Sequence, residues 1–287
     1  MKMMIIAVIA YLVLAPIVGG FLAGIDRKLS ARMQSRVGPP IRQPFYDVFK
    51  LTEKEDITVN NVQDFYVLCF LIFIIVTGCL FFAGQSLLLV FFTLTTASAF
   101  LIIAAYSSNS PYAEAGAQRE LLQVMAYEPM VLLVAVGLYM ATGTFQVSQI
   151  MTQTSMPFWS TWGILIGYVF ILTIKMRKSP FDLSMSEHAH QELVGGLKTE
   201  WSGKTLAMVE VAHWYENVML LGLVFLFFQN GTVQGVIIGI VEAIIAYLFE
   251  IVVDNSFARM KWQVAINCSW IVALVFGGVN LFVLMLM

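Results

Sequence analysis

Five carboxylates lie inside strongly apolar stretches of this 287-residue chain, and their positions are Glu128, Glu210, Glu216, Glu242 and Glu250. A charged side chain at the centre of a bilayer costs roughly 2.5 to 3.5 kcal/mol on insertion scales. Such residues normally face the interior of a helix bundle or a wet cavity, where they mark the path of an ion. The alternative for each one is a protonated carboxyl that only bonds one helix to another. Five in one chain favour an ion path.

A polar stripe accompanies two of these carboxylates. Glu210, His213 and Asn217 follow one another at intervals of three and four residues, so they share one face of a helix. Glu216 lies three residues after His213 and points toward the neighbouring face. We therefore place His213 on the same ion path as the carboxylates.

The densest group of charges lies between residues 175 and 204, where five basic residues, four acids and two histidines separate two apolar stretches. We interpret this segment as a coupling loop that contacts a soluble partner. Its candidate residues are Asp182, Glu187, His188, His190, Glu192 and Glu200. The unperturbed pKa of histidine is near 6.5, which suits a response to local charge. An exposed structural contact is the alternative for the two loop histidines.

These residues must be positioned by membrane-spanning helices. The chain is 59% hydrophobic and only 12% charged, whereas soluble domains carry about 25% charged residues. Apolar runs of about 20 residues recur along its whole length. We predict a single all-α integral-membrane domain over residues 1–287, with eight spans at about 3–24, 64–83, 86–106, 119–142, 158–176, 205–228, 232–253 and 264–286.

The basic residues predict the orientation of these spans. Fifteen of the sixteen Lys and Arg residues lie in or beside the odd-numbered loops, and Lys2 is the exception. Residues 143–156, the fourth loop, carry no charge. The positive-inside rule then places the large loops 1, 3 and 5 in the cytoplasm and both termini outside.

Two further loops carry candidate partner or cavity residues, which are Arg36, Asp47, Lys50, Arg119 and Glu120. In the first loop a short amphipathic helix is predicted from Pro44, either as an interfacial anchor or as the lip of a cavity beneath the partner. In the third loop, Glu120 shares a helix face with Gln123 and Tyr127. Arg119 either holds a neighbouring carboxylate charged or anchors the helix end.

The three cysteines, Cys69, Cys79 and Cys268, lie singly in apolar segments with no metal or cluster spacing. We expect no metal site and no iron–sulfur ligand set in this chain.

Three separated motifs resemble one known family. The first is Arg36-x-Gly38-Pro39 with Gln43-Pro44, Asp47 and Lys50-Leu51. The second is Ser108-Asn109-Ser110 with Tyr112-Ala113, Arg119, Gln123 and Tyr127-Glu128. The third is Pro180-Phe181-Asp182-Leu183, followed by Glu192-Leu193-Val194 and Thr199-Glu200-x-Ser202-Gly203. Together they resemble the subunit 1 family of respiratory complex I, also called its H family, which includes eight-span subunits of energy-converting nickel–iron hydrogenases.

The run His188-Ala189-His190-Gln191-Glu192-Leu193-Val194 departs from the quinone-reducing members, which carry two more carboxylates there. It is similar to the Ech and membrane-bound hydrogenase branch. That resemblance implies an ion-translocating subunit without a redox centre of its own, in a prokaryotic cytoplasmic membrane. It implies a nickel–iron centre and iron–sulfur clusters in the partners, which would be hydrogenase large and small subunits and an iron–sulfur subunit on the cytoplasmic side, with an antiporter-like membrane subunit. No nucleic-acid partner is expected.

Two rival functions are weighed beside this one. The first is a quinone-site membrane subunit of a complex I (NADH:quinone oxidoreductase). The second is a stand-alone secondary transporter, a class that usually shows two related halves with interrupted helices. The long charged loops favour a permanent partner over a transporter.

Overall fold

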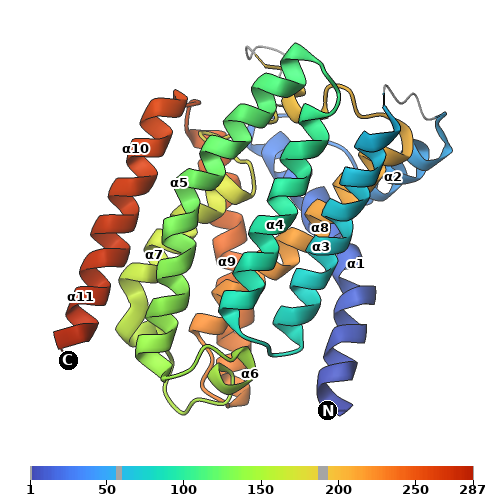
Figure 1. Ribbon diagram of the computed structural model, residues 1–287. Helices are drawn as coiled ribbons and strands as arrows, with labels where there is room; N and C mark the ends of the chain where they lie inside the picture. The colour runs from blue at the N-terminus through green and yellow to red at the C-terminus, as the bar shows by residue number, and fades with distance from the viewer. Residues whose placement is uncertain (1, 56–59, 187–192, 287) are drawn as a thin grey trace.

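The computed structural model describes residues 2–55, 60–186 and 193–286, and within them eight helices are long and apolar enough to cross a membrane (Figure 1). The first seven are α1 (Lys2–Met33), α3 (Asn61–Phe82), α4 (Leu87–Tyr106), α5 (Pro111–Thr142), α7 (Phe158–Lys175), α8 (Gly203–Phe227) and α9 (Val233–Ser256). The eighth joins α10 (Trp262–Val272) to α11 (Val279–Leu286) through a π-helical turn, Ala273–Gly278. The predicted all-α class and the eight spans are confirmed.

Two helices extend well beyond their predicted spans. Helix α1 continues to Met33 although its apolar run predicts an end near residue 24, and α5 begins at Pro111 rather than near residue 119. Residues 25–33 are charged but still helical, and Pro111 occupies a first-turn position where its missing N–H costs nothing. Hydropathy thus marks the part of a helix that lipid surrounds, and not the end of the helix.

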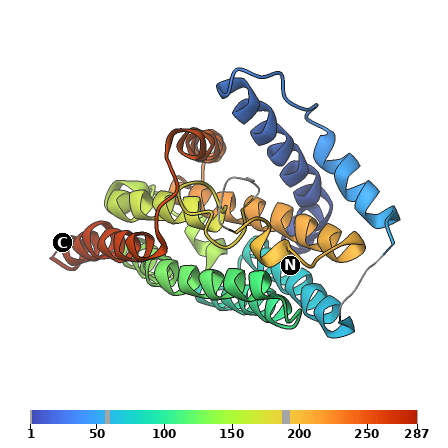
Figure 2. The same cartoon turned by 90° about the horizontal axis from the view of Figure 1, so that it is seen from above.

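The buried centre of the bundle is formed by α4, α5, α7 and α8. Between 50% and 56% of the most apolar window of each of these helices is buried, against 22–28% for α1, α9 and the α10–α11 span. Seen from above, α1, α9 and α10–α11 lie at the outside of the bundle (Figure 2). Their many exposed Ile, Val and Phe side chains suit a lipid or membrane-protein environment.

Both chain ends lie at one end of the bundle (Figure 1). The opposite end carries the amphipathic helix α2 (Gln43–Glu53) and the 3₁₀ turn η1 (Gly196–Lys198), whereas the short helix α6 (Val147–Ile150) lies near the termini. The prediction of a short helix near Pro44 is confirmed. Phe45 on α2 packs against Trp214 of α8, with ring centroids 5.2 Å apart.

The described part of the segment between α7 and α8 is packed against α5 and is not a free loop. The backbone N–H of Leu197 donates to the carbonyl of Ser184 (3.2 Å), and Gln123 of α5 donates to the carbonyl of Phe181. A Cβ on Gly116 of α5 would lie 2.6 Å from the backbone nitrogen of Leu197, so only glycine allows this close approach. The sequence predicts a loop that contacts an aqueous partner, and the structure buries much of it.

We predict that the end of the bundle bearing α2 faces the cytoplasm. In a background without the three native cysteines, Lys54→Cys should be protected from a membrane-impermeant thiol reagent added to intact cells, and Thr154→Cys should be labelled. Both positions are exposed, so access alone decides the outcome. Labelling of Lys54→Cys with protection of Thr154→Cys would reverse the orientation.

Candidate functional site

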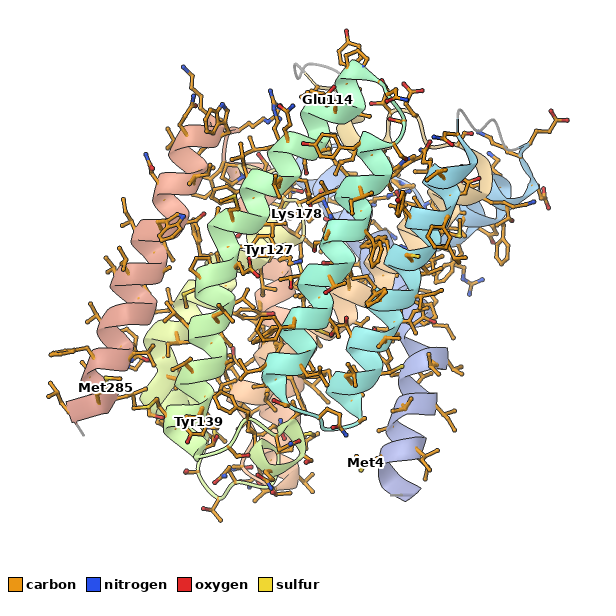
Figure 3. The ribbon with its side chains drawn as sticks, viewed as in Figure 1. Met4, Glu114, Tyr127, Tyr139, Lys178 and Met285 are labelled. Carbon is orange, nitrogen blue, oxygen red and sulfur yellow. The ribbon has the colours of Figure 1, made fainter. Side chains whose placement is uncertain are left out.

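An ion pair is buried at the end of α7. Lys175 Nζ lies 3.2 Å from Glu216 Oε1 of α8, and the two side chains are 5% and 3% exposed. Lys175 also donates to Ser98 Oγ of α4 (3.3 Å) and lies 4.6 Å from the centre of the Tyr127 ring of α5. Figure 3 shows Tyr127 in the part of the bundle nearer the α2 end. Four helices therefore meet around one ammonium group.

Arg177 extends this pair toward the loop. Its Nη2 donates to Glu120 Oε1 of α5 (3.0 Å), and its Nη1 lies 3.1 Å from His213 Nδ1 and 3.8 Å from Glu216 Oε2. Arg177 adopts φ 52°, a conformation that non-glycine residues rarely adopt unless the surrounding contacts hold it. Glu120 accepts a second hydrogen bond, from Ser184 in the loop.

Arg177 is a fixed charge and not a proton carrier. Burial lowers the pKa of its guanidinium, but the carboxylates of Glu120 and Glu216 outweigh burial and hold the pKa above its ordinary value. A proton can be exchanged only by the acidic groups and the imidazole beside it. His213 Nδ1 lies 3.3 Å from Glu216 Oε2, within the range in which one proton can be shared.

These contacts form one continuous polar network, which we call the α7 network. It runs from Ser184 in the loop through Glu120, Arg177, His213, Glu216 and Lys175 to Ser98 and Tyr127. Positive and negative charges alternate along it, so no buried charge on this line lacks an opposite neighbour.

A polar cavity of about 210 Å³ lies against the α7 network. Asp182, Glu210, His213 and Asn217 are among the residues that line it, so the polar stripe on α8 faces one space. Glu210 Oε1 is paired with Lys198 Nζ at 2.7 Å. Lys175 and Arg177 also line the cavity, so the α7 network borders a space where water can lie.

Lys178 links α1 to α9 at the α2 end of the bundle. Its ammonium pairs with Asp26 of α1 and with Asp254 of α9 (3.3 Å), while the backbone N–H of Ser179 donates to Asp254 Oδ1 (2.8 Å). Burial lowers the pKa of Lys178, but the two aspartates outweigh burial and raise it above its ordinary value. Figure 3 shows Lys178 close to the depth of Tyr127.

The structure keeps three predicted ion-path residues apart from the α7 network. Glu128 on α5 is partly exposed, and it has no hydrogen bond or ion pair to any described residue. Glu242 lines a separate, largely apolar cavity between α7 and α9. Glu250 is completely buried on α9 near Thr173.

The predicted loop residues are more dispersed. Asp47 pairs with Arg27 (2.6 Å), and Asp182 is buried with Arg259 Nε 3.6 Å away. Arg119 donates to the carbonyl of Leu183 (3.4 Å). Arg36 and Lys50 are exposed, and Glu200 is partly exposed. Glu187, His188, His190 and Glu192 lie outside the described residues.

Three basic residues of this site were not predicted as site residues. Lys175, Arg177 and Lys178 end an apolar run, a position that ordinarily indicates the membrane boundary and the cytoplasmic side. The available signal was their density, because three cations within four residues next to an apolar span need several acidic or polar partners.

A bundle of eight apolar helices with buried, paired charges at one end defines a multi-pass membrane subunit. The model of the family described as NADH dehydrogenase matches residues 4–285, so the chain belongs to this family, the complex I subunit 1 or H family.

The comparisons include relatives from two kinds of complex. Hydrogenase-4 component C of Escherichia coli (strain K12) is 25% identical, over 93% of this chain and 92% of that protein. The H-type subunit of the NADH-quinone oxidoreductase of Rickettsia bellii (strain OSU 85-389) is 29% identical, over 74% of this chain and 68% of that protein.

One solved structure has the same fold. It is a chain of the membrane-bound sulfane sulfur reductase, an archaeal respiratory membrane complex, with a TM-score of 0.85 and 24% identity over 98% of this chain and 99% of that one. The family match and the two sequence relatives make the protein a membrane subunit of a complex I-like or hydrogenase-type respiratory complex, in a prokaryotic cell membrane.

We predict that the Lys175–Glu216 pair dominates the stability of the site. Removal of one partner from a buried pair costs about 3–5 kcal/mol because the other charge stays buried. Lys175→Met should lower the thermal midpoint of the purified complex clearly. Arg27→Gln, at the partly exposed pair with Asp47, should cost below about 1 kcal/mol. The double variant Lys175→Met/Glu216→Met should recover part of the loss. Equal midpoints for Lys175→Met and Arg27→Gln would contradict the prediction.

Proposed function

We propose that this chain is the ion-translocating membrane subunit of an energy-converting nickel–iron hydrogenase. It couples ferredoxin-linked hydrogen formation or oxidation in a soluble arm to the movement of protons or sodium ions. The observation that carries the proposal is the α7 network, because it joins a loop at the α2 end to a carboxylate in the centre of the bundle. The near full-length match to hydrogenase-4 component C supports the hydrogenase branch.

The redox centres of this complex belong to its other subunits. The hydrogenase large and small subunits and an iron–sulfur subunit bind at the α2 end, and an antiporter-like subunit lies beside the bundle in the membrane. Reduction in the soluble arm changes the charge near the coupling loop. Because Ser184 of that loop donates to Glu120, a shift of the loop alters the partner set of Arg177.

The ion path begins in the polar cavity. Glu210 and His213 take up a proton from its water, and Glu216 shares that proton through its contact with His213. Lys175 and Arg177 keep the charge of the cluster balanced when the proton arrives or leaves. Glu128, Glu242 and Glu250 are the further candidate residues of the path, and water must bridge any gap to them.

A quinone-site subunit of a complex I is the second candidate, and one observation favours it. Tyr247 lines both the polar cavity and an apolar cavity of about 950 Å³ between α1, α8 and α9. A molecule with a polar head and a long apolar tail fits such a pair of spaces. Quinone bound to the purified complex, or inhibition by quinone-site inhibitors, would favour this candidate over the hydrogenase.

We predict that Glu216→Gln and Glu210→Gln uncouple the complex. Glutamine retains the shape and hydrogen bonding of the side chain but cannot exchange a proton. Ion uptake per hydrogen formed should fall in membrane vesicles, while the complex still assembles. Thr154→Val, at an exposed position between α6 and α7 and far from the α2 end, is the control.

The measurement is hydrogen formation from reduced ferredoxin together with ion uptake by the same vesicles. An unchanged ratio in both glutamine variants would make these acids structural and move the path to another subunit.

A further inference from the structure

The outer helix α9 carries a carboxyl inside an apolar groove. Glu242 lines a cavity of about 580 Å³ whose walls come from α7 and α9 and whose floor includes Val224 of α8. Ile166 on the α7 wall is 45% exposed, and Ile245 and Phe249 on the α9 wall are 51% and 52% exposed. The groove therefore reaches the lateral surface of the bundle. In Figure 2, α9 lies at this outer edge.

The carboxyl lies near the middle of the membrane. Glu242 follows the first residue of α9, Val233, by nine positions, which is about 14 Å along a helix. The hydrocarbon core of a bilayer is about 30 Å thick. At this depth the free-energy cost of placing a carboxyl in the membrane is therefore close to its maximum.

Glu242 has no hydrogen bond or ion pair to any described residue. Glu216 and Glu210 differ, because each contacts a lysine of this chain. The other cavity-lining residues around Glu242 are apolar, apart from Thr173. The chain thus supplies a groove and an acceptor at mid-membrane depth, without a partner for that acceptor.

We propose that a transmembrane helix of another membrane subunit packs into this groove and places a hydrogen-bond donor against Glu242. The donor is a lysine or arginine, or an amide or hydroxyl side chain. A lipid tail fills the same space but offers no donor, so it leaves the cost of a carboxyl at this depth uncompensated. Buried polar groups between membrane helices are normally bonded across the interface.

A photocrosslinking experiment on the intact complex in its own membrane tests the proposal. The photoreactive residue p-benzoylphenylalanine is placed at Ile245 on the groove wall, and at Ile244 as the control. Ile244 lies on the same helix at a similar depth, is 52% exposed, and lines the apolar cavity between α1, α8 and α9 instead of this groove.

The Ile245 probe should crosslink one membrane subunit several-fold more strongly than the Ile244 probe. Mass spectrometry of the product should locate a Lys, Arg, Asn, Gln, Ser or Thr in the crosslinked helix. Lipid adducts alone at both positions would overturn the proposal, and so would equal crosslinking from both positions.

Substitution of the carboxyl gives a second measurement. Glu242→Leu should lower the amount of the crosslinked subunit in the purified complex, relative to this chain, while Glu242→Gln retains more of it because its amide still accepts a hydrogen bond. Val241→Leu is the matched control. Wild-type subunit ratios in Glu242→Leu would contradict the proposal. The readout is assembly, so loss or survival of ion transport does not affect it.

Discussion

The rest of the bundle depends on the ion pair between Lys175 and Glu216, because the surrounding helices must stabilise two charges that are buried away from water. Removing two charges from water costs several kcal/mol for each ion, and mutual attraction offsets this only when the geometry is good and further hydrogen bonds are present. Here α4 contributes Ser98, α5 contributes the Tyr127 ring, and the loop contributes Arg177. The pair is therefore a tertiary constraint that fixes how four helices and one loop meet.

Because charges of opposite sign alternate along the α7 network, a change of charge at one member affects its neighbours. Glu120, Arg177, Glu216 and Lys175 form a line of opposite neighbours with His213 beside it. In a medium of low effective dielectric constant, a change at one member alters the energy of the next by more than it would in water. Arg177 keeps its charge, so the acids and His213 are groups through which the line can change state. An arrangement of this kind connects a loop to the membrane interior through adjacent charges.

The sequence predicts the elements of this protein better than the contacts between them. Eight apolar runs predict eight spans. The spacing of Glu210, His213 and Asn217 predicts that they share one face of a helix, and in the structure all three line one cavity. Helix ends were predicted less well, because the charged continuation of α1 is still helical. The roles of Lys175, Arg177 and Lys178 were missed since a cation after an apolar run is equally typical of a membrane boundary. Which carboxylate pairs with each of them depends on helices far apart in the chain.

The burial of the coupling loop shows why such pairing is hard to predict. Its described part carries charges that indicate solvent, yet Gly116 allows its backbone to approach α5 within contact distance. A charged loop then becomes part of the protein interior, and Asp182 is only 5% exposed. A charge reversal at Asp182 would therefore act through Arg259 inside this chain before it acted on a partner.

The carboxylates of the membrane region differ in which group stabilises each of them. Glu216 and Glu210 are compensated by lysines of the same chain, and Glu120 by Arg177. Glu242 has no such partner among the described residues, and it lines a groove that opens to the side of the bundle. A stand-alone transporter would have to expose this groove to lipid tails, which offer no donor at any depth. The uncompensated carboxyl is therefore a physical reason, separate from the family resemblance, to regard the chain as one part of a larger membrane assembly.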